Sequence, residues 1–332
     1  MKRIAKITVA LLLAVAMCFS LAGCYDEDLN WSAKYDDTEL PAGAYIYYLS
    51  IAYNEAASKV STEDEVLKCE IDGTPAETWI KDRADEYVNQ YFYIQNEMKR
   101  LGLEMTDEDY STCLQTTENY WNYFGTSFEK FGIAKTSFDI AYSQYNRMYL
   151  KVFNALYGEG GENEVPESEL RQHIEDDYYD YEYFSAPLTK TDDDNKSVDL
   201  TDEEKADLKE TLEKYKTKIE SGAMTVNDAA TDYALKVQKD STYQTGIKDE
   251  NGMQSSYMPD AFISAIKEMN EGDVEVVEST KYMIVLHRLP IKEDEDTLLE
   301  SSDNRSQLLL ELKNTEYADA VSAAAQSFEG VE

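Results

Sequence analysis

The apolar positions in the first half of the chain repeat with the period of an α-helix. Between residues 80 and 101 they recur at steps of three and four, at Ile80, Ala84, Val88, Tyr91, Ile94, Met98 and Leu101. Gly102 follows as a stop, and Thr106 with Asp109 then begins a second segment. A third segment covers residues 136–157. The pattern predicts a helical domain over residues 42–178.

The second helical segment is rich in aromatic side chains. Tyr120, Trp121 and Phe124 fall within little more than one helical turn. The simplest interpretation is that these rings pack in a hydrophobic core. A mobile aromatic groove that binds peptides is the alternative, and the sequence leaves it open.

The hydrophobic pattern changes after residue 178. Residues 181–186 suit a strand, and apolar positions at Val274, Val276 and residues 282–286 indicate two more. Helical spacing returns between these strands, at Leu208, Leu212, Tyr215, Ile219, Val226, Ala230, Tyr233 and Val237, and then at Phe262, Ala265, Ile266 and Met269. We therefore predict a mostly helical α+β fold. An N-terminal helical region and a C-terminal helix (293–332), expected to pack on it, flank a small α+β domain (179–292).

The first residues of the chain have the layout of a secretory signal. A basic stretch precedes the apolar residues 7–20, and Leu21-Ala22-Gly23-Cys24 follows. The apolar run is shorter than the roughly 20 residues of a membrane-spanning helix, which argues against a permanent transmembrane anchor. Resemblance to bacterial lipoprotein signals implies removal of residues 1–23 and a diacylglyceryl group on Cys24, with residues 24–41 as a tether. Two acyl chains give stable attachment to a membrane.

The acidity of the chain limits its partners. The formal net charge is -36 at pH 7, with 67 acidic and 31 basic residues. Nucleic acid is therefore not an expected partner, because binding it requires a basic surface. The simplest interpretation of this acidity is that it keeps the protein soluble. The more specific alternative is that the protein prefers cationic or unfolded polypeptides as partners.

Cysteine and histidine are scarce outside the signal. Cys69 and Cys113 are the only two that can pair in an oxidising exterior, and the sequence does not decide whether they do. There is no C-x-x-C pair, and His173 and His287 are the only histidines, so we expect no metal and no cofactor. The acidic run at residues 192–194 lacks the glycine of a calcium loop and is interpreted as a solvated loop.

The α+β region resembles a parvulin-type peptidyl-prolyl isomerase domain. A helix ending at Gly222 is followed by residues 226–234, which parallel the family's F-A-E-L-A-x-x-Y-S. Met258 and Phe262 parallel M-x-x-x-F, residues 272–275 parallel G-x-x-S, and residues 281–285 parallel G-Y-H-I-I. The spacing agrees over about 110 residues. With its flanking helices, the whole chain resembles the PrsA-type foldase lipoproteins of Gram-positive bacteria.

The departures from the family concern its histidines. Parvulins carry one histidine in the first strand, where this chain has residues 183–186 and no histidine, and one in the last strand, where it has Met283. His287 comes four residues later, about 13 Å farther along a strand. The resemblance therefore assigns no catalytic residue. It implies an apolar proline pocket of Met258, Phe262, Tyr282 and Met283, although Met258 and Phe262 fit equally well as core residues.

The resemblance implies a function outside the cell. We expect an extracytoplasmic chaperone or foldase, held at the cell membrane by lipid on Cys24, that binds emerging secreted polypeptides with weak or no isomerase activity. An active prolyl isomerase and a non-catalytic scaffold or binding lipoprotein are the alternatives, and a homodimer is possible. Nucleophilic triads have few candidate members in a chain with two histidines and no G-x-S-x-G elbow.

Overall fold

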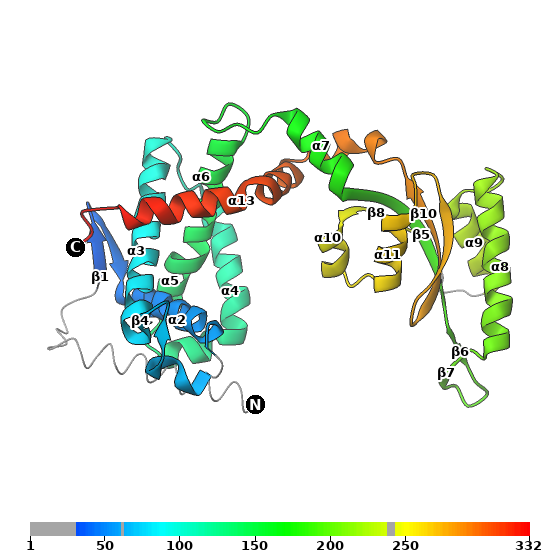
Figure 1. The fold of residues 1–332 in the computed structure, drawn as a ribbon, viewed down its shortest axis with the longest axis horizontal. Coiled ribbons are helices and arrows are strands. Elements are labelled where there is room, and N and C mark those ends of the chain that lie inside the picture. The colour runs from blue at the N-terminus through cyan, green and yellow to red at the C-terminus, as the bar shows by residue number, and fades with distance from the viewer. Residues whose placement is uncertain (1–30, 61–62, 238–242) are drawn as a thin grey trace. The chain divides into compact units, whose positions relative to one another are not determined.

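Helices make up most of the computed structural model, which describes residues 31–60, 63–237 and 243–332 (Figure 1). Small antiparallel sheets supply the remaining regular structure, so the prediction of a mostly helical α+β fold is confirmed. Over the described ranges, no helix combines the length and the apolar character needed to cross a bilayer. The predicted signal peptide and Cys24 lie outside the described residues.

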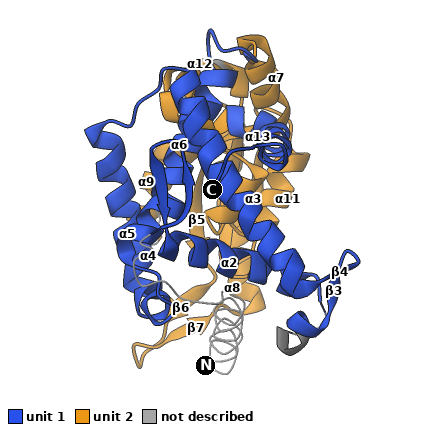
Figure 2. Cartoon of the chain, turned by 90° about the vertical axis from the view of Figure 1, so that its left-hand side faces the viewer, with its two compact units in different colours: residues 1–164, 309–332 blue, residues 165–308 orange. Residues whose placement is uncertain are grey.

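The chain divides into two compact units (Figure 2). Unit 1 comprises residues 1–164 and 309–332, and unit 2 comprises residues 165–308. Unit 2 therefore extends beyond the expected domain of residues 179–292 at both ends. A guanidinium explains part of this extension, because Arg171 donates hydrogen bonds to Glu295 (3.0 Å) and Asp296 (2.7 Å) and so ties the two flanking segments together.

Unit 1 consists of helices with two small hairpins. Its elements are β1 (Trp31–Tyr35), β2 (Thr38–Pro41), α2 (Ala42–Ser58), η1 (Glu63–Lys68), β3 (Glu70–Ile71), β4 (Thr74–Pro75), α3 (Ala76–Arg100), α4 (Asp107–Lys130), α5 (Lys135–Phe138), the π-helical η2 (Asp139–Gln144) and α6 (Tyr145–Tyr157). Helix α3 buries the face that the sequence pattern indicates, including Ile80, Val88 and Ile94. A capping box of Thr106 and Asp109 begins α4, also as expected.

The hairpin of β1 and β2 occupies residues that were expected to form a tether. β1 pairs with β2 in antiparallel fashion, and Leu40 is fully buried. The backbone of Lys34 also exchanges two hydrogen bonds of 2.9 Å with that of Glu332. Residues 31–41 of the expected tether (24–41) therefore form a hairpin, and residues 24–30 lie outside the described residues.

Unit 2 is built around a four-stranded antiparallel sheet with the strand order β8-β5-β10-β9. Its elements are α7 (Glu167–Asp177), β5 (Tyr178–Pro187), β6 (Thr189–Thr191), β7 (Ser197–Asp199), α8 (Asp202–Glu220), α9 (Val226–Lys236), β8 (Gln244–Asp249), α10 (Glu250–Ser255), α11 (Asp260–Glu268), β9 (Val274–Glu278), β10 (Tyr282–Leu289), η3 (Ile291–Glu293) and α12 (Glu295–Glu300). The sequence pattern did not indicate β8, α10 or the β6–β7 hairpin.

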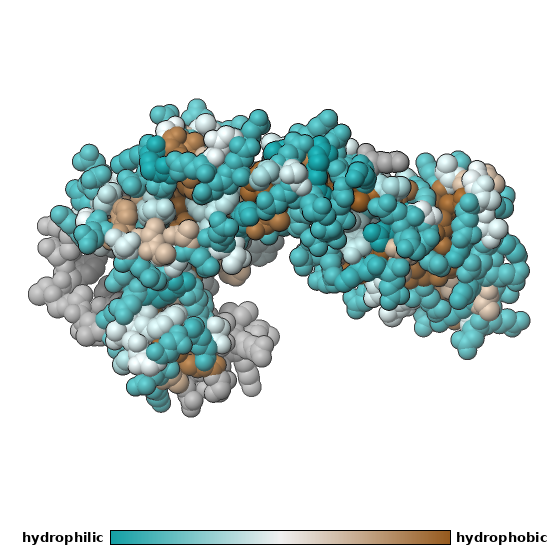
Figure 3. All heavy atoms as spheres, turned by 45° about the horizontal axis from the view of Figure 1, so that its top comes forward, coloured by the Kyte–Doolittle hydropathy of each residue, from teal (hydrophilic) through white to brown (hydrophobic). Residues whose placement is uncertain are grey.

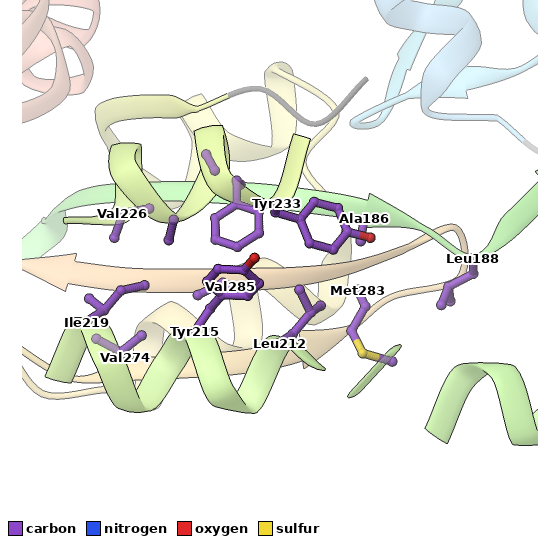
Figure 4. Close-up of a cluster of buried hydrophobic side chains, with 13 residues drawn as sticks. Ala186, Leu188, Leu212, Tyr215, Ile219, Val226, Tyr233, Val274, Met283 and Val285 are labelled. Carbon is purple, nitrogen blue, oxygen red and sulfur yellow. The ribbon is translucent and has the colours of Figure 1, made fainter. Parts of the chain in front are cut away.

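Each face of the sheet carries its own hydrophobic cluster. Helices α8 and α9 pack with Phe184, Met283 and Val285 on one face (Figure 4). Residues of α10 and α11 pack with Tyr181 and Ile284 on the other. Side chains of successive strand residues point to opposite faces, so each strand serves both clusters.

The last helix, α13 (Ser302–Gln326), begins in unit 2 and returns to unit 1. Tyr317 is 3% exposed, and its ring lies 4.6 Å from that of Tyr149 and 5.3 Å from that of Phe153. The side-chain amide of Asn89 donates to the carbonyl of Ala325 (3.2 Å). These contacts place the end of α13 in the core of unit 1.

Hydrophilic residues dominate the face of the molecule shown in Figure 3, and hydrophobic residues appear there only in small patches. This agrees with the strong acidic excess of the sequence. Contiguous exposed clusters of large apolar side chains on soluble proteins often mark interaction sites.

A buried carboxyl in β5 makes the stability of unit 2 dependent on pH. Asp180 is 3% exposed, and burial, then the hydrogen bond and charge of Asp294, raise its pKa to about 7. The folded state thus holds this proton more strongly than the unfolded state, and stability is lost as pH rises from about 4 to 7. We expect Asp180→Asn to raise the free energy of unfolding of unit 2 at pH 7 by roughly 1–3 kcal/mol.

Urea unfolding at pH 5 and at pH 7.5 measures this effect. Hydrogen exchange of the β5 amides reports the unfolding of unit 2 in each experiment. The variant is expected to gain stability mainly at the higher pH. Asp193→Asn, in the exposed loop between β6 and β7, is the control and leaves both values unchanged. An equal gain at the two pH values would contradict the assignment of the effect to Asp180.

Candidate functional site

The structure separates the four residues of the expected proline pocket. Phe262 is fully buried in the cluster formed with Tyr181 and Ile284. Met283 is 1% exposed and belongs to the cluster on the other face of the sheet. Because Met283 and Ile284 are neighbours in β10, their side chains point in opposite directions. Phe262 and Met283 therefore do not line one pocket and are core residues in this structure.

The other two expected residues, Met258 and Tyr282, do line one cavity. It measures about 450 Å³ and lies between the start of α11 and the turn joining β9 to β10. Tyr257 also lines this cavity; 94% of its surface is exposed, and its backbone φ is 57°. Asp260 and Lys281 contribute opposite charges to the lining. A cavity of this size accommodates a short peptide segment.

His287 is engaged in a local hydrogen-bond network. Its Nδ1 lies 2.8 Å from Glu182 Oε1, and the hydroxyl of Tyr243 donates to Glu182 Oε2 (2.8 Å). Burial acts to raise the pKa of Glu182, but the hydrogen bonds from His287 and Tyr243 outweigh it and hold the pKa below its usual value. The network gives this histidine a structural role in β10, and His287 does not line the Met258 cavity. Among the described residues, no group of three metal-binding side chains is found.

Truncation of Phe262 is expected to affect stability rather than a binding pocket. Phe262→Ala should lower the free energy of unfolding of unit 2 by about 3–5 kcal/mol, because the ring packs edge-on against Tyr181 and Tyr183 at 5.2 Å. Met258→Ala, at the partly buried rim of the same cluster, serves as the control and should cost much less. Thermal unfolding followed by circular dichroism compares the two. Similar losses for both variants would contradict this assignment.

A second candidate site lies in unit 1, where helix α4 buries small and polar side chains. Its buried positions are Asp109, Cys113, Thr117 and Gly125. Thr117 Oγ1 donates to Asp139 Oδ1 (2.6 Å) and lies 2.7 Å from Ser143 Oγ. The Cys113 thiol donates to the backbone carbonyl of Ser143 (3.5 Å). Both cysteines of the described chain, Cys69 and Cys113, are free.

The carboxylate of Asp109 holds the start of α4 by ion pairs. It is 2% exposed, and it accepts hydrogen bonds from Arg147 and from Lys151 (2.7 Å) on α6 and from the backbone amide of Thr106 (2.9 Å). Burial acts to raise the pKa of this carboxyl. The bonds from Lys151, Thr106 and Arg147 outweigh burial and hold the pKa well below its usual range.

The large apolar side chains of α4 are exposed. Nine large hydrophobic side chains are exposed among the described residues, and five of them belong to this helix. These five, hereafter the α4 surface, are Tyr110 (45%), Leu114 (57%), Tyr120 (40%), Tyr123 (84%) and Phe124 (51%). The ring of Phe124 lies 6.4 Å from those of Tyr120 and Tyr123, so the three rings form a continuous group. The expected core role of this segment is therefore only partly correct.

Charged residues are nearly absent from the α4 surface. From Tyr110 to Phe128 the only charged residue is Glu118, in a chain of which 30% is charged, and Glu118 forms an ion pair with Lys135. The remaining positions are mostly aromatic, hydroxyl or amide residues. The hydroxyl of Tyr142 donates a hydrogen bond to that of Tyr120 (2.8 Å). Burial raises the pKa of Tyr142 to about 12. Aromatic, amide and hydroxyl residues with few charges are typical of protein-binding surfaces.

This protein therefore has a mostly helical α+β fold, an exposed aromatic surface on α4 and a cavity large enough for a short peptide segment. No protein-family model matches the sequence, and no curated protein matches it. Among solved structures, the chain is similar to the foldase protein PrsA from Streptococcus pneumoniae, with 13% identity and a TM-score of 0.38, covering 78% of this chain and 92% of that one. It is also similar to the PrsA foldase from Lactococcus lactis, with 11% identity and a TM-score of 0.37, covering 90% and 93%.

These solved structures are of the same kind as the proteins that the sequence motifs resemble.

Proposed function

We propose that this protein is an extracytoplasmic chaperone of the foldase type that holds secreted polypeptides before they fold. The observation that carries the proposal is the α4 surface, where aromatic side chains are exposed on an otherwise hydrophilic and acidic protein. Unfolded chains expose apolar segments, and an uncharged aromatic surface binds such segments with little sequence preference. The lipoprotein signal that ends at Cys24 supports attachment to the outer face of the cell membrane.

The acidic charge supports the same proposal. Net negative charge attracts basic clients over distance, and it keeps copies of the chaperone apart while their aromatic surfaces are free. We therefore expect the monomer to present the α4 surface to clients, although the same surface also suits a homodimer. Sedimentation at micromolar concentration separates these two states, and a dimer that dissociates when client is added remains compatible with the proposal.

Suppression of client aggregation tests the proposed function. The mature chain, beginning at Cys24 without lipid, is mixed at near-equal molar ratio with several denatured clients, including reduced lysozyme, and light scattering is recorded. We expect scattering to be suppressed for basic and neutral clients. If no client is protected at equimolar ratio, the chaperone proposal is wrong.

The proposed activity includes weak or absent prolyl isomerisation. A catalyst of this reaction must bind the twisted peptide more tightly than either planar form, which requires polar groups beside an apolar proline pocket. Here Phe262 and Met283 are buried on opposite faces of the sheet, and His287 is bound to Glu182. A proline tetrapeptide assay is expected to show little acceleration, and strong acceleration lost in Met258→Ala would favour the alternative of an active isomerase.

A further inference from the structure

A second cavity in unit 2 lies apart from the residues considered so far. It has a volume of about 440 Å³ and lies between the β6–β7 hairpin, helix α8 and the end of α9. This volume falls within the range of pockets that bind small ligands or short peptide segments. None of its lining residues belongs to the cavity of Met258 and Tyr282.

The walls of this cavity are partly apolar. Pro187, Leu200, Leu208 and Val237 contribute apolar side chains, and Val237 is 55% exposed at the rim. The charges of Lys190 and Glu204 at the rim are used in an ion pair with each other. Thr189, Thr191, Thr211 and Asp207 also belong to the lining, so the cavity can accommodate both an apolar side chain and a hydrogen-bonding backbone.

A tyrosine hydroxyl borders the same cavity. Tyr233 is 1% exposed, and its ring packs 5.7 Å from Phe184 and 6.1 Å from Tyr215 (Figure 4). The hydroxyl of Tyr215 donates to Asp232 Oδ2 (2.8 Å), whereas that of Tyr233 has no hydrogen-bond partner among the described residues. A hydroxyl that lines a cavity and has no partner within the described protein can donate to water or to an acceptor on an occupant of the cavity.

The strand beside the cavity can pair with a further strand. β6 lines the cavity and pairs only with β7 in a two-stranded sheet of the described chain. One edge of β6 therefore has backbone N–H and C=O groups that no strand of the described structure pairs. Unpaired edges of this kind are templates for an added polypeptide strand.

From the partly apolar walls, the unpaired Tyr233 hydroxyl and the open edge of β6, we infer that this cavity binds an extended, uncharged polypeptide segment. The segment pairs with β6, inserts an apolar side chain between Leu208 and Val237, and accepts a hydrogen bond from Tyr233 through a backbone carbonyl. This goes beyond the proposed function, because the site belongs to unit 2 whereas α4 belongs to unit 1. The site can be present even if α4 holds no client.

Binding of a labelled peptide to the mature full chain tests the inference. The probe is a fluorescein-labelled heptapeptide, Ser-Thr-Leu-Thr-Val-Ser-Gly, measured by fluorescence anisotropy. Tyr233→Phe removes only the hydroxyl and is expected to weaken binding about three- to tenfold. Val237→Asp places a charge at the rim and is expected to weaken binding at least about tenfold. Tyr257→Ser, in the other cavity, and the α4 variant Tyr123→Ser/Phe124→Ser should bind the probe as the wild type does.

A second probe separates a peptide from other apolar occupants. The same heptapeptide with every backbone nitrogen methylated cannot donate backbone hydrogen bonds to β6 from either edge and is expected to bind at least about tenfold more weakly. The inference is overturned if the first probe does not bind, if it binds both cavity variants as tightly as the wild type, or if the methylated probe binds equally well. The last result would indicate a site for small apolar molecules.

Discussion

Replacement of Tyr123 and Phe124 by serine is expected to abolish most of the protection of aggregating clients while the protein remains folded. Both side chains are more than half exposed, so their loss removes little from the core of unit 1. Truncation of central aromatic residues at a binding surface commonly costs 2 kcal/mol or more. We therefore expect roughly tenfold more of the variant than of the wild type to be needed for equal suppression of light scattering.

The matched control is Leu235→Ser, which removes an apolar side chain of similar exposure (81%) from α9 in unit 2. It should leave protection unchanged. Both variants should retain the thermal midpoint of the wild type. Equal loss of protection in both would assign the effect to overall surface hydrophobicity rather than to the α4 surface.

The largest effect on stability in unit 1 is expected from Asp109→Ala. Removing this buried carboxylate leaves Arg147 and Lys151 without their partner and deletes the capping box with Thr106. Loss of one partner from a buried ion pair costs several kcal/mol, and the two cations are partly exposed, so we expect a decrease of about 2–4 kcal/mol. All three tryptophans of the chain, Trp31, Trp79 and Trp121, lie in unit 1, so their fluorescence during urea unfolding reports this unit.

The pH dependence of the same variant provides a second readout. The pKa of Asp109 is depressed in the folded protein, so its stabilisation is complete above the unfolded value near 4 and is lost as pH falls further. Wild type and variant should therefore converge in stability at acidic pH. Asp107→Ala, at an exposed position of the same first turn, is the control. A constant difference between wild type and Asp109→Ala down to pH 2 would contradict the assigned role.

The helices could be predicted because their apolar positions are periodic and their ends carry strong signals. The capping boxes of Thr106 and Thr201 and the left-handed Gly102 and Gly222 are local features, and the structure places them at helix ends. Strand β8 could not be predicted, because residues 244–249 show no apolar alternation and are held by pairing with β5. That pairing is a tertiary effect.

The expected proline pocket shows a different limit of sequence reasoning. The motif spacing located Phe262 in a helix, Tyr282 and Met283 in a strand and Met258 just before the helix, but it did not indicate which face of the sheet each side chain would occupy. Alternation in β10 separates Met283 from Ile284, and Phe262 packs on the Ile284 side. For α4, the sequence could not show that Thr117 would be buried and Phe124 half exposed, because both faces of the helix contain polar and aromatic residues.

The hydrogen bonds beneath α4 also determine its rotation. Contacts between methyl groups tolerate rotation of a helix by one residue, about 100°, because one apolar side chain can replace another. The hydrogen bonds that Thr117 donates to Asp139 and that Asp109 accepts from Lys151 are directional, and such a rotation would break both. The aromatic rings therefore cannot turn inward to escape water. Polar hydrogen bonds therefore determine which face of this helix is exposed, and apolar packing alone would not do so.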